Sequence, residues 1–202
     1  MLLRLPVLLI WLRLPLGLLV LLLGQGPATP FARGLGAVLL VLGLLTDIFD
    51  GILARRLGIA TAALRRLDST IDTLFWLGVA GGVLGFYPEF LANHLPWIAG
   101  VLGLEALTYL VSYGRFRREI ALHTLGAKLW ALLLAACLTR LLLTGEAGSW
   151  FGLCVGVGVV SRLEILAILG VLPAWAADVP TLYQALQLRR GRRGWRHPLF
   201  NS

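Results

Sequence analysis

Four aspartates fall within 26 residues of the sequence, as the pairs Asp47 with Asp50 and Asp68 with Asp72. Spacings of three and four residues place each pair on one face of a helix. The first pair closes a long apolar run and the second opens another, so we expect both at or just inside a membrane surface, where an unpaired carboxylate is costly. Four carboxylates that face one another repel, and one or two divalent cations would hold them together. Ligands that offer only oxygen favour Mg²⁺ or Mn²⁺ over zinc.

Small and basic residues stand at defined positions between the two pairs, namely Gly51, Ala54 and Arg55. With the four aspartates they follow the pattern D-x2-D-G-x2-A-R-x8-G-x3-D-x3-D. The stretch 47–72 therefore resembles the signature of the CDP-alcohol phosphotransferases (CDP-alcohol phosphatidyltransferases), the membrane enzymes that make phospholipids. One position departs from the signature, because Leu64 replaces its second glycine, a residue type that lets the backbone approach a ligand closely.

The resemblance implies a site for two metal ions, Mg²⁺ or Mn²⁺, at the four aspartates. Asp47, Asp50 and Asp68 are implied as metal ligands. Asp72 is implied both as a ligand of the second ion and as the catalytic base that takes the proton from an incoming alcohol. Metal ions would neutralise the charge that develops on phosphate oxygens. The implied reaction is attack by the alcohol on the lipid-side phosphorus of a CDP-lipid such as CDP-diacylglycerol, which releases CMP.

The CDP donor is expected against the helix face that carries the first aspartate pair. Gly51 and Ala54 lack bulk there, which leaves room for the nucleotide, and Arg55 would pair bidentately with a donor phosphate.

The acceptor alcohol is less well defined. Arg115, Arg118 and Lys128 would suit a phosphorylated acceptor such as glycerol 3-phosphate or inositol phosphate, and we take them as candidate acceptor ligands. The two arginines also fit a topological role, and Lys128 also fits a solvated lysine at the interface, so both interpretations stay open.

The composition places the chain among membrane proteins. It has 202 residues, of which 58% are hydrophobic, and its mean hydropathy is +0.86, which is too apolar for a soluble domain of this length. The net charge is +8. Because the arginines cluster between apolar runs, anionic lipid head groups are a better partner than nucleic acid.

The apolar segments predict an all-α integral membrane protein with short interfacial helices at the cytoplasmic side. Each segment is near the ~20 residues that a bilayer requires. We predict one membrane domain over residues 1–177 and a basic amphipathic cytoplasmic tail over 178–202. A short interfacial helix is also expected in the linker between the aspartate pairs. The six predicted spans are 3–23, 34–55, 68–87, 95–113, 122–144 and 149–172.

Basic residues predict the orientation. Arginines gather in every second connection and in the tail, while the alternate connections carry few. By the positive-inside rule, both termini and all four aspartates would face the cytoplasm, in a bacterial inner (cell) membrane. The first segment could instead be a removed signal peptide, but Arg13 interrupts it, and the resemblance places an arginine early in the first helix, which favours retention.

Two further features concern helix packing. Gly78 with Gly82, and Gly81 with Gly85, are small-xxx-small pairs, which serve either packing within the chain or a dimer face. The resemblance implies a homodimer and favours the second interpretation. Separately, Glu105 and Arg162 fall in the middle of predicted spans. We expect them to form a structural ion pair, with acceptor binding as the alternative.

Three other functions compete with this one. A UbiA-type prenyltransferase also uses aspartates and magnesium, but keeps its motifs far apart in the sequence. A membrane cation transporter could use intramembrane aspartates, but it does not predict Gly51, Ala54 and Arg55 at their offsets. An inactive relative of the phosphotransferases is favoured by Leu64.

Overall fold

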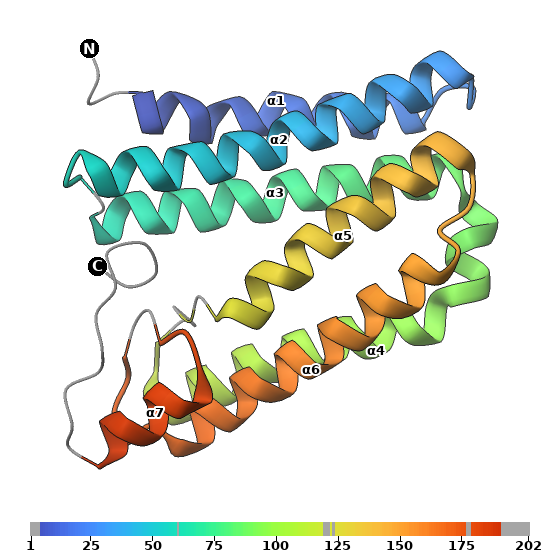
Figure 1. Cartoon of the computed structure of the whole chain (residues 1–202). Coiled ribbons are helices and arrows are strands. Elements are labelled where there is room, and N and C mark those ends of the chain that lie inside the picture. Colours follow the sequence, from blue (N-terminus) through green and yellow to red (C-terminus); the bar gives the residue numbers. More distant parts are fainter. Residues whose placement is uncertain (1–4, 60, 119–121, 123, 177–178, 191–202) are drawn as a thin grey trace. The chain divides into compact units, whose positions relative to one another are not determined.

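The computed structural model describes residues 5–59, 61–118, 122, 124–176 and 179–190, and every regular element in these ranges is an α-helix (Figure 1). Among the described residues, six helices are long and apolar enough to cross a membrane, which confirms the predicted all-α class with six spans. A seventh, short helix follows them. The helices are α1 (Leu5–Gly24), α2 (Pro30–Arg56), α3 (Ala62–Phe86), α4 (Pro88–Phe116), α5 (Leu125–Thr144), α6 (Ser149–Val171) and α7 (Leu182–Arg189).

The linker between the aspartate pairs differs from the prediction. We expected a separate interfacial helix there, but α2 continues to Arg56 and α3 already begins at Ala62. The turn between them includes Gly58 at a φ of 67°, a backbone conformation that glycine adopts without strain. Thr61 then caps α3, because its hydroxyl accepts a hydrogen bond from the Leu64 N–H. The basic residues after the turn therefore belong to the first turns of α3.

The chain divides into two compact units. The first comprises residues 1–93 and 135–147, and the second comprises 94–134 and 148–202. In the first unit, α1 lies against both α2 and α3, and the three helices run side by side (Figure 1). This arrangement brings the end of α2 and the start of α3 to the same end of the unit.

Glycines allow α1 and α3 to pack backbone against backbone. A Cβ atom added at Gly78 would lie 2.6 Å from the carbonyl oxygen of Gly17, and one at Gly82 or Gly85 would meet the α1 backbone still more closely. At Gly81 an added Cβ would meet the side chain of Leu21 at 2.6 Å. The two glycine pairs thus serve packing within the chain, and our assignment of them to a dimer face was wrong. The homodimer itself stays a prediction.

The second unit contains the predicted intramembrane ion pair. Arg162 Nε on α6 lies 2.5 Å from Glu105 Oε2 on α4, and the Arg162 guanidinium also lies over the Trp130 ring, 4.6 Å from its centroid. The Arg162 side chain is only 9% exposed. A buried charge needs such a partner because its desolvation is costly. The prediction of a structural pair between Glu105 and Arg162 is confirmed.

Helix α7 packs on the end of α6 (Figure 1). Ala185 of α7 is buried in a small core with Ile165, Ile168 and Leu172, and Thr181 caps the helix by accepting from the Gln184 N–H. A helix is thus present in the predicted tail, and the amphipathic character of the tail stays a prediction. Residues 191–202, which carry much of the predicted basic charge, lie outside the described residues.

We predict that Gly82→Ala destabilises the protein by about 1–3 kcal/mol or more, because the new methyl group would overlap the α1 backbone. The measurement is the melting temperature of the purified protein in detergent. Gly103→Ala is the matched control, since an added Cβ there meets nothing within 4 Å. Equal melting temperatures for the two variants would contradict the proposed α1–α3 contact.

We predict that Glu105→Gln lowers stability by about 3 kcal/mol, because it leaves the Arg162 charge buried without its partner. The double variant Glu105→Gln/Arg162→Gln should lose less than the sum of the two single variants. The measurement is thermal unfolding of the wild type, Glu105→Gln, Arg162→Gln and the double variant. Additive losses would show that the two charges do not interact.

Candidate functional site

The two aspartate pairs lie where the buried faces of α2 and α3 reach the same end of the first unit. On α2, the buried residues Leu40 and Gly43 are followed at helical spacing by Asp47 and Asp50. On α3, Asp68 and Asp72 lead at the same kind of spacing into the buried residue Phe75. Both pairs therefore face inward, because they continue the core stripes of their helices.

The four carboxylates differ in exposure. The Asp50 side chain is 4% exposed, whereas those of Asp47, Asp68 and Asp72 are 38%, 32% and 30% exposed. Asp50 thus lies at the inner end of the cluster, and the other three side chains are partly exposed. Exposure on one side is what a site that admits an ion or a substrate requires.

Three of the carboxylates lie close enough to share a metal ion. One oxygen from each of Asp47, Asp50 and Asp68 lies within 4.8 Å of the other two. All three donors are carboxylate oxygens, a set that suits a hard divalent cation such as Mg²⁺ or Mn²⁺. The residues present therefore fit the metal that the signature implies.

A fifth charged residue lies at the centre of the cluster, and the sequence analysis gave it no role in the site. Arg13 of α1 is fully buried, and its guanidinium makes ion pairs with all four aspartates. The distances to Asp47 Oδ1 and Asp68 Oδ1 are 3.0 and 2.5 Å. We call these five residues the carboxylate–arginine cluster.

A sequence signal for Arg13 does exist. It stands three residues after Ile10 and three before Leu16, and all three are buried on α1, so its spacing is that of a core position. A charge at such a position in a membrane helix requires an opposite charge nearby. The signal was hard to use because α1 is apolar on all sides, which leaves its inward face unmarked.

The candidate donor residues lie on the last turns of α2. Ala54 is buried, and Arg55 is exposed. Gly51 lies beside Arg55, since a Cβ added at Gly51 would be 3.4 Å from the Arg55 Nη1 atom. The absence of a side chain at Gly51 leaves this guanidinium room to lie along the helix surface.

Leu64, which replaces the signature glycine, lies in the first turn of α3 and is half-buried. Its N–H is used in the cap of the helix. It therefore occupies an ordinary helical position, and the local backbone does not require glycine there.

The candidate acceptor residues belong to the second unit. Arg115 donates hydrogen bonds to the carbonyl oxygens of Gly170 and Leu172, at 3.1 and 3.0 Å, and so caps the end of α6. Arg118 lies over the Trp175 ring at 5.0 Å. Lys128 is exposed on α5. These contacts give both arginines structural partners, and an acceptor role for the three residues stays a prediction.

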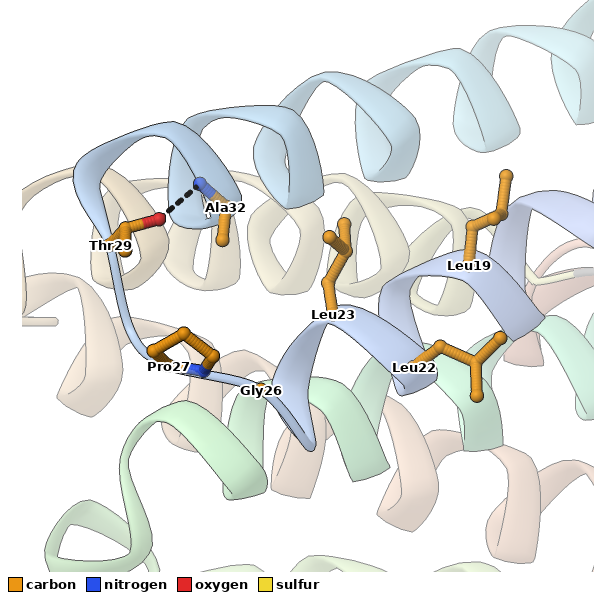
Figure 2. Close-up of a pocket in the computed structure, with 7 residues that line it drawn as sticks. All are labelled: Leu19, Leu22, Leu23, Gly26, Pro27, Thr29 and Ala32. Carbon is orange, nitrogen blue, oxygen red and sulfur yellow. Dashed lines mark hydrogen bonds between the residues drawn. The ribbon is translucent and has the colours of Figure 1, made fainter.

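A hollow of about 290 Å³ lies between the end of α1 and the start of α2 (Figure 2). The Thr29 hydroxyl accepts a hydrogen bond from the Ala32 N–H. The hollow is lined by Leu19, Leu22, Leu23, Gly26, Pro27, Thr29 and Ala32. Because it lies at the opposite end of α2 from Asp47 and Asp50, it offers no groups for the chemistry of the cluster.

Comparison with known proteins adds one finding. The chain matches no curated protein sequence and no solved structure. The family model for CDP-alcohol phosphatidyltransferase matches residues 3–176, which include α1 to α6 and the whole carboxylate–arginine cluster. The chain therefore belongs to the CDP-alcohol phosphatidyltransferase family, whose general activity is the transfer of phospholipid head groups.

Proposed function

We propose that the protein transfers a phosphatidyl group from a CDP-linked lipid, such as CDP-diacylglycerol, to an alcohol acceptor and releases CMP. The observation that carries the proposal is the convergence of the four signature aspartates from α2 and α3 on one partly solvent-accessible cluster. A cluster of this charge in a membrane protein demands cations, and a diphosphate substrate is a natural ligand for cations held by carboxylates.

The reaction exchanges one phosphorus–oxygen bond for another. The acceptor oxygen forms a bond to the lipid-side phosphorus, and the bond between that phosphorus and the bridging oxygen breaks. CMP leaves with the bridging oxygen and its electron pair, while the acceptor hydroxyl loses its proton. When bound, divalent metal would neutralise charge on the phosphate oxygens.

Each residue of the signature receives a role in this proposal. Asp47, Asp50 and Asp68 would hold the metal, and Asp72 would accept the proton of the acceptor hydroxyl as general base. On α2, the exposed guanidinium of Arg55 would bind a donor phosphate in bidentate fashion. Positioning matters here because transfer to phosphorus depends mainly on alignment and charge neutralisation.

We further propose that the cluster faces the cytoplasm, where CDP-linked donors and polar acceptors meet the membrane. Arg55 and Arg56 end α2, and Arg65 and Arg66 follow in the first turns of α3, all of them exposed. These four charges lie at the same helix ends as the aspartates, and the positive-inside rule keeps such groups in the cytoplasm. The preferred acceptors are glycerol 3-phosphate and inositol phosphate, with Arg115, Arg118 and Lys128 as candidate ligands.

The test of the proposal is release of CMP by the purified full-length protein. Labelled CDP-diacylglycerol is incubated with Mg²⁺ or Mn²⁺ and, in parallel, with glycerol 3-phosphate, inositol phosphate or serine. We expect CMP release with one of these acceptors, and its complete loss when EDTA removes the metal. Failure with every acceptor and both metals would overturn the proposal that this chain is active.

Asp72→Asn should lower the rate of CMP release by about 100-fold or more, because the amide cannot take the proton of the acceptor hydroxyl. The matched control is Glu89→Gln, which neutralises an exposed acid in the first turn of α4 and should leave the rate unchanged. Equal activity of the Asp72 variant and the wild type would remove Asp72 from the mechanism.

A second candidate, an inactive member of the family, is favoured by Leu64 alone. The half-buried leucine side chain lies four residues before Asp68, on the same face of α3. Leu64→Gly separates the two candidates. Activity that appears only in this variant would mean that the wild-type chain is inactive, whereas activity in both proteins would show that the leucine is tolerated.

A further inference from the structure

The contacts of Arg13 form a regular pattern within the carboxylate–arginine cluster. Its Nη1 atom contacts Asp47 of α2 and Asp72 of α3, and its Nη2 atom contacts Asp50 of α2 and Asp68 of α3. Each terminal nitrogen therefore joins one carboxylate from each helix. A planar guanidinium is suited to this because its donors point in fixed, diverging directions.

The charges in the cluster do not balance. In their ionised forms, the four carboxylates and the one guanidinium carry a net formal charge of −3, with the Arg13 side chain fully buried and that of Asp50 nearly so. In addition, the Nε atom of Arg13 is buried without a hydrogen-bond partner. Arg13 thus holds the carboxylates together but leaves most of their charge uncompensated, and it leaves one of its own donors unsatisfied.

The guanidinium uses the same groups that a metal would use. Asp47, Asp50 and Asp68 are the three residues whose oxygens lie close enough to share an ion, and Arg13 contacts each of them. A divalent cation among these oxygens would repel the guanidinium and replace it as their partner. Arg13 and a divalent metal would therefore compete for the same carboxylates.

We propose that Arg13 is an internal cation that occupies the carboxylate cluster in the metal-free protein and is displaced, at least in part, when divalent metal binds. This inference rests on the proposed function, because it takes the aspartates as metal ligands. The exchange has two consequences. Arg13 keeps α1, α2 and α3 together before metal arrives, and it lowers the apparent affinity of the site, since only the fraction of molecules with Arg13 displaced accepts an ion.

The experiment measures Mn²⁺ binding alone, without any substrate, to the purified full-length protein in detergent. Titration is followed by calorimetry or by the loss of the free Mn²⁺ signal in electron paramagnetic resonance. We expect the Mn²⁺ affinity of Arg13→Gln to exceed that of the wild type by about tenfold or more, because the competing cation is gone. Without metal, the same variant should melt at a lower temperature, and Mn²⁺ should raise its melting temperature by more than it raises that of the wild type.

Two variants test the cause of the effect. Arg33→Gln removes the same charge from α2, where Arg33 donates to the Tyr87 hydroxyl, about 21 Å along the helix from Asp47. It should bind Mn²⁺ as the wild type does. Arg13→Lys keeps the charge but loses the forked contacts, so its affinity should lie between those of the wild type and Arg13→Gln. If Arg13→Gln does not fold, the comparison of Arg13→Lys with the wild type carries the same test.

The outcomes distinguish this inference from the proposed function. Mn²⁺ binding that Asp50→Asn weakens, but that removal of Arg13 leaves unchanged or also weakens, would overturn the exchange while the metal site stands. Mn²⁺ binding by neither the wild type nor any Arg13 variant would overturn both. Tighter binding in the Arg13 variants and unchanged binding in Arg33→Gln would support the exchange.

Discussion

The mutual repulsion of four aspartates in their ionised form is the constraint on which the arrangement of the first unit depends. Two helices that each carry an aspartate pair repel at the ends where those pairs meet. A cation between them reverses the sign of that interaction. In this structure the cation is Arg13 of α1, which contacts both pairs at once. The ends of α2 and α3 thus stay together because a third helix brings a positive charge to them.

The glycines of α1 and α3 allow the Arg13 side chain to reach the aspartates. An arginine side chain has limited reach, so the backbone of α1 must come close to its neighbours for the guanidinium to contact four acids. Gly17 and Gly24 on α1 face Gly78, Gly82 and Gly85 on α3, and their backbones touch. Lipid tails are as apolar as leucine, so the hydrophobic effect does not hold helices together inside a membrane. Helices there associate through close packing of small residues and through electrostatic contacts. Helix α1 therefore holds the unit together in two ways, by the close packing of its glycines and by the charge of Arg13.

The proposed chemistry places a second demand on the same cluster. A site for divalent metal must keep its carboxylates charged and close, yet it must release whatever holds them in the absence of metal. Asp50 is nearly buried, while Asp47, Asp68 and Asp72 are each about a third exposed. In the proposed chemistry, the open side would give an ion and a phosphate a route of entry. The buried side, with Arg13, would preserve the geometry of the carboxylates.

The sequence by itself determined the helical class, the six spans and the aspartates of the candidate site. Those features follow from local rules: a span needs a run of apolar residues, and residues three or four apart share a helix face. The sequence also predicted the pair of Glu105 with Arg162, because a charge within an apolar span is costly unless an opposite charge lies beside it. Only the tertiary structure decided that Arg13 lies among the aspartates and that the glycine pairs face α1. On a helix that is apolar on every side, no pattern marks the inward face, so the partner of each side chain is fixed by packing alone.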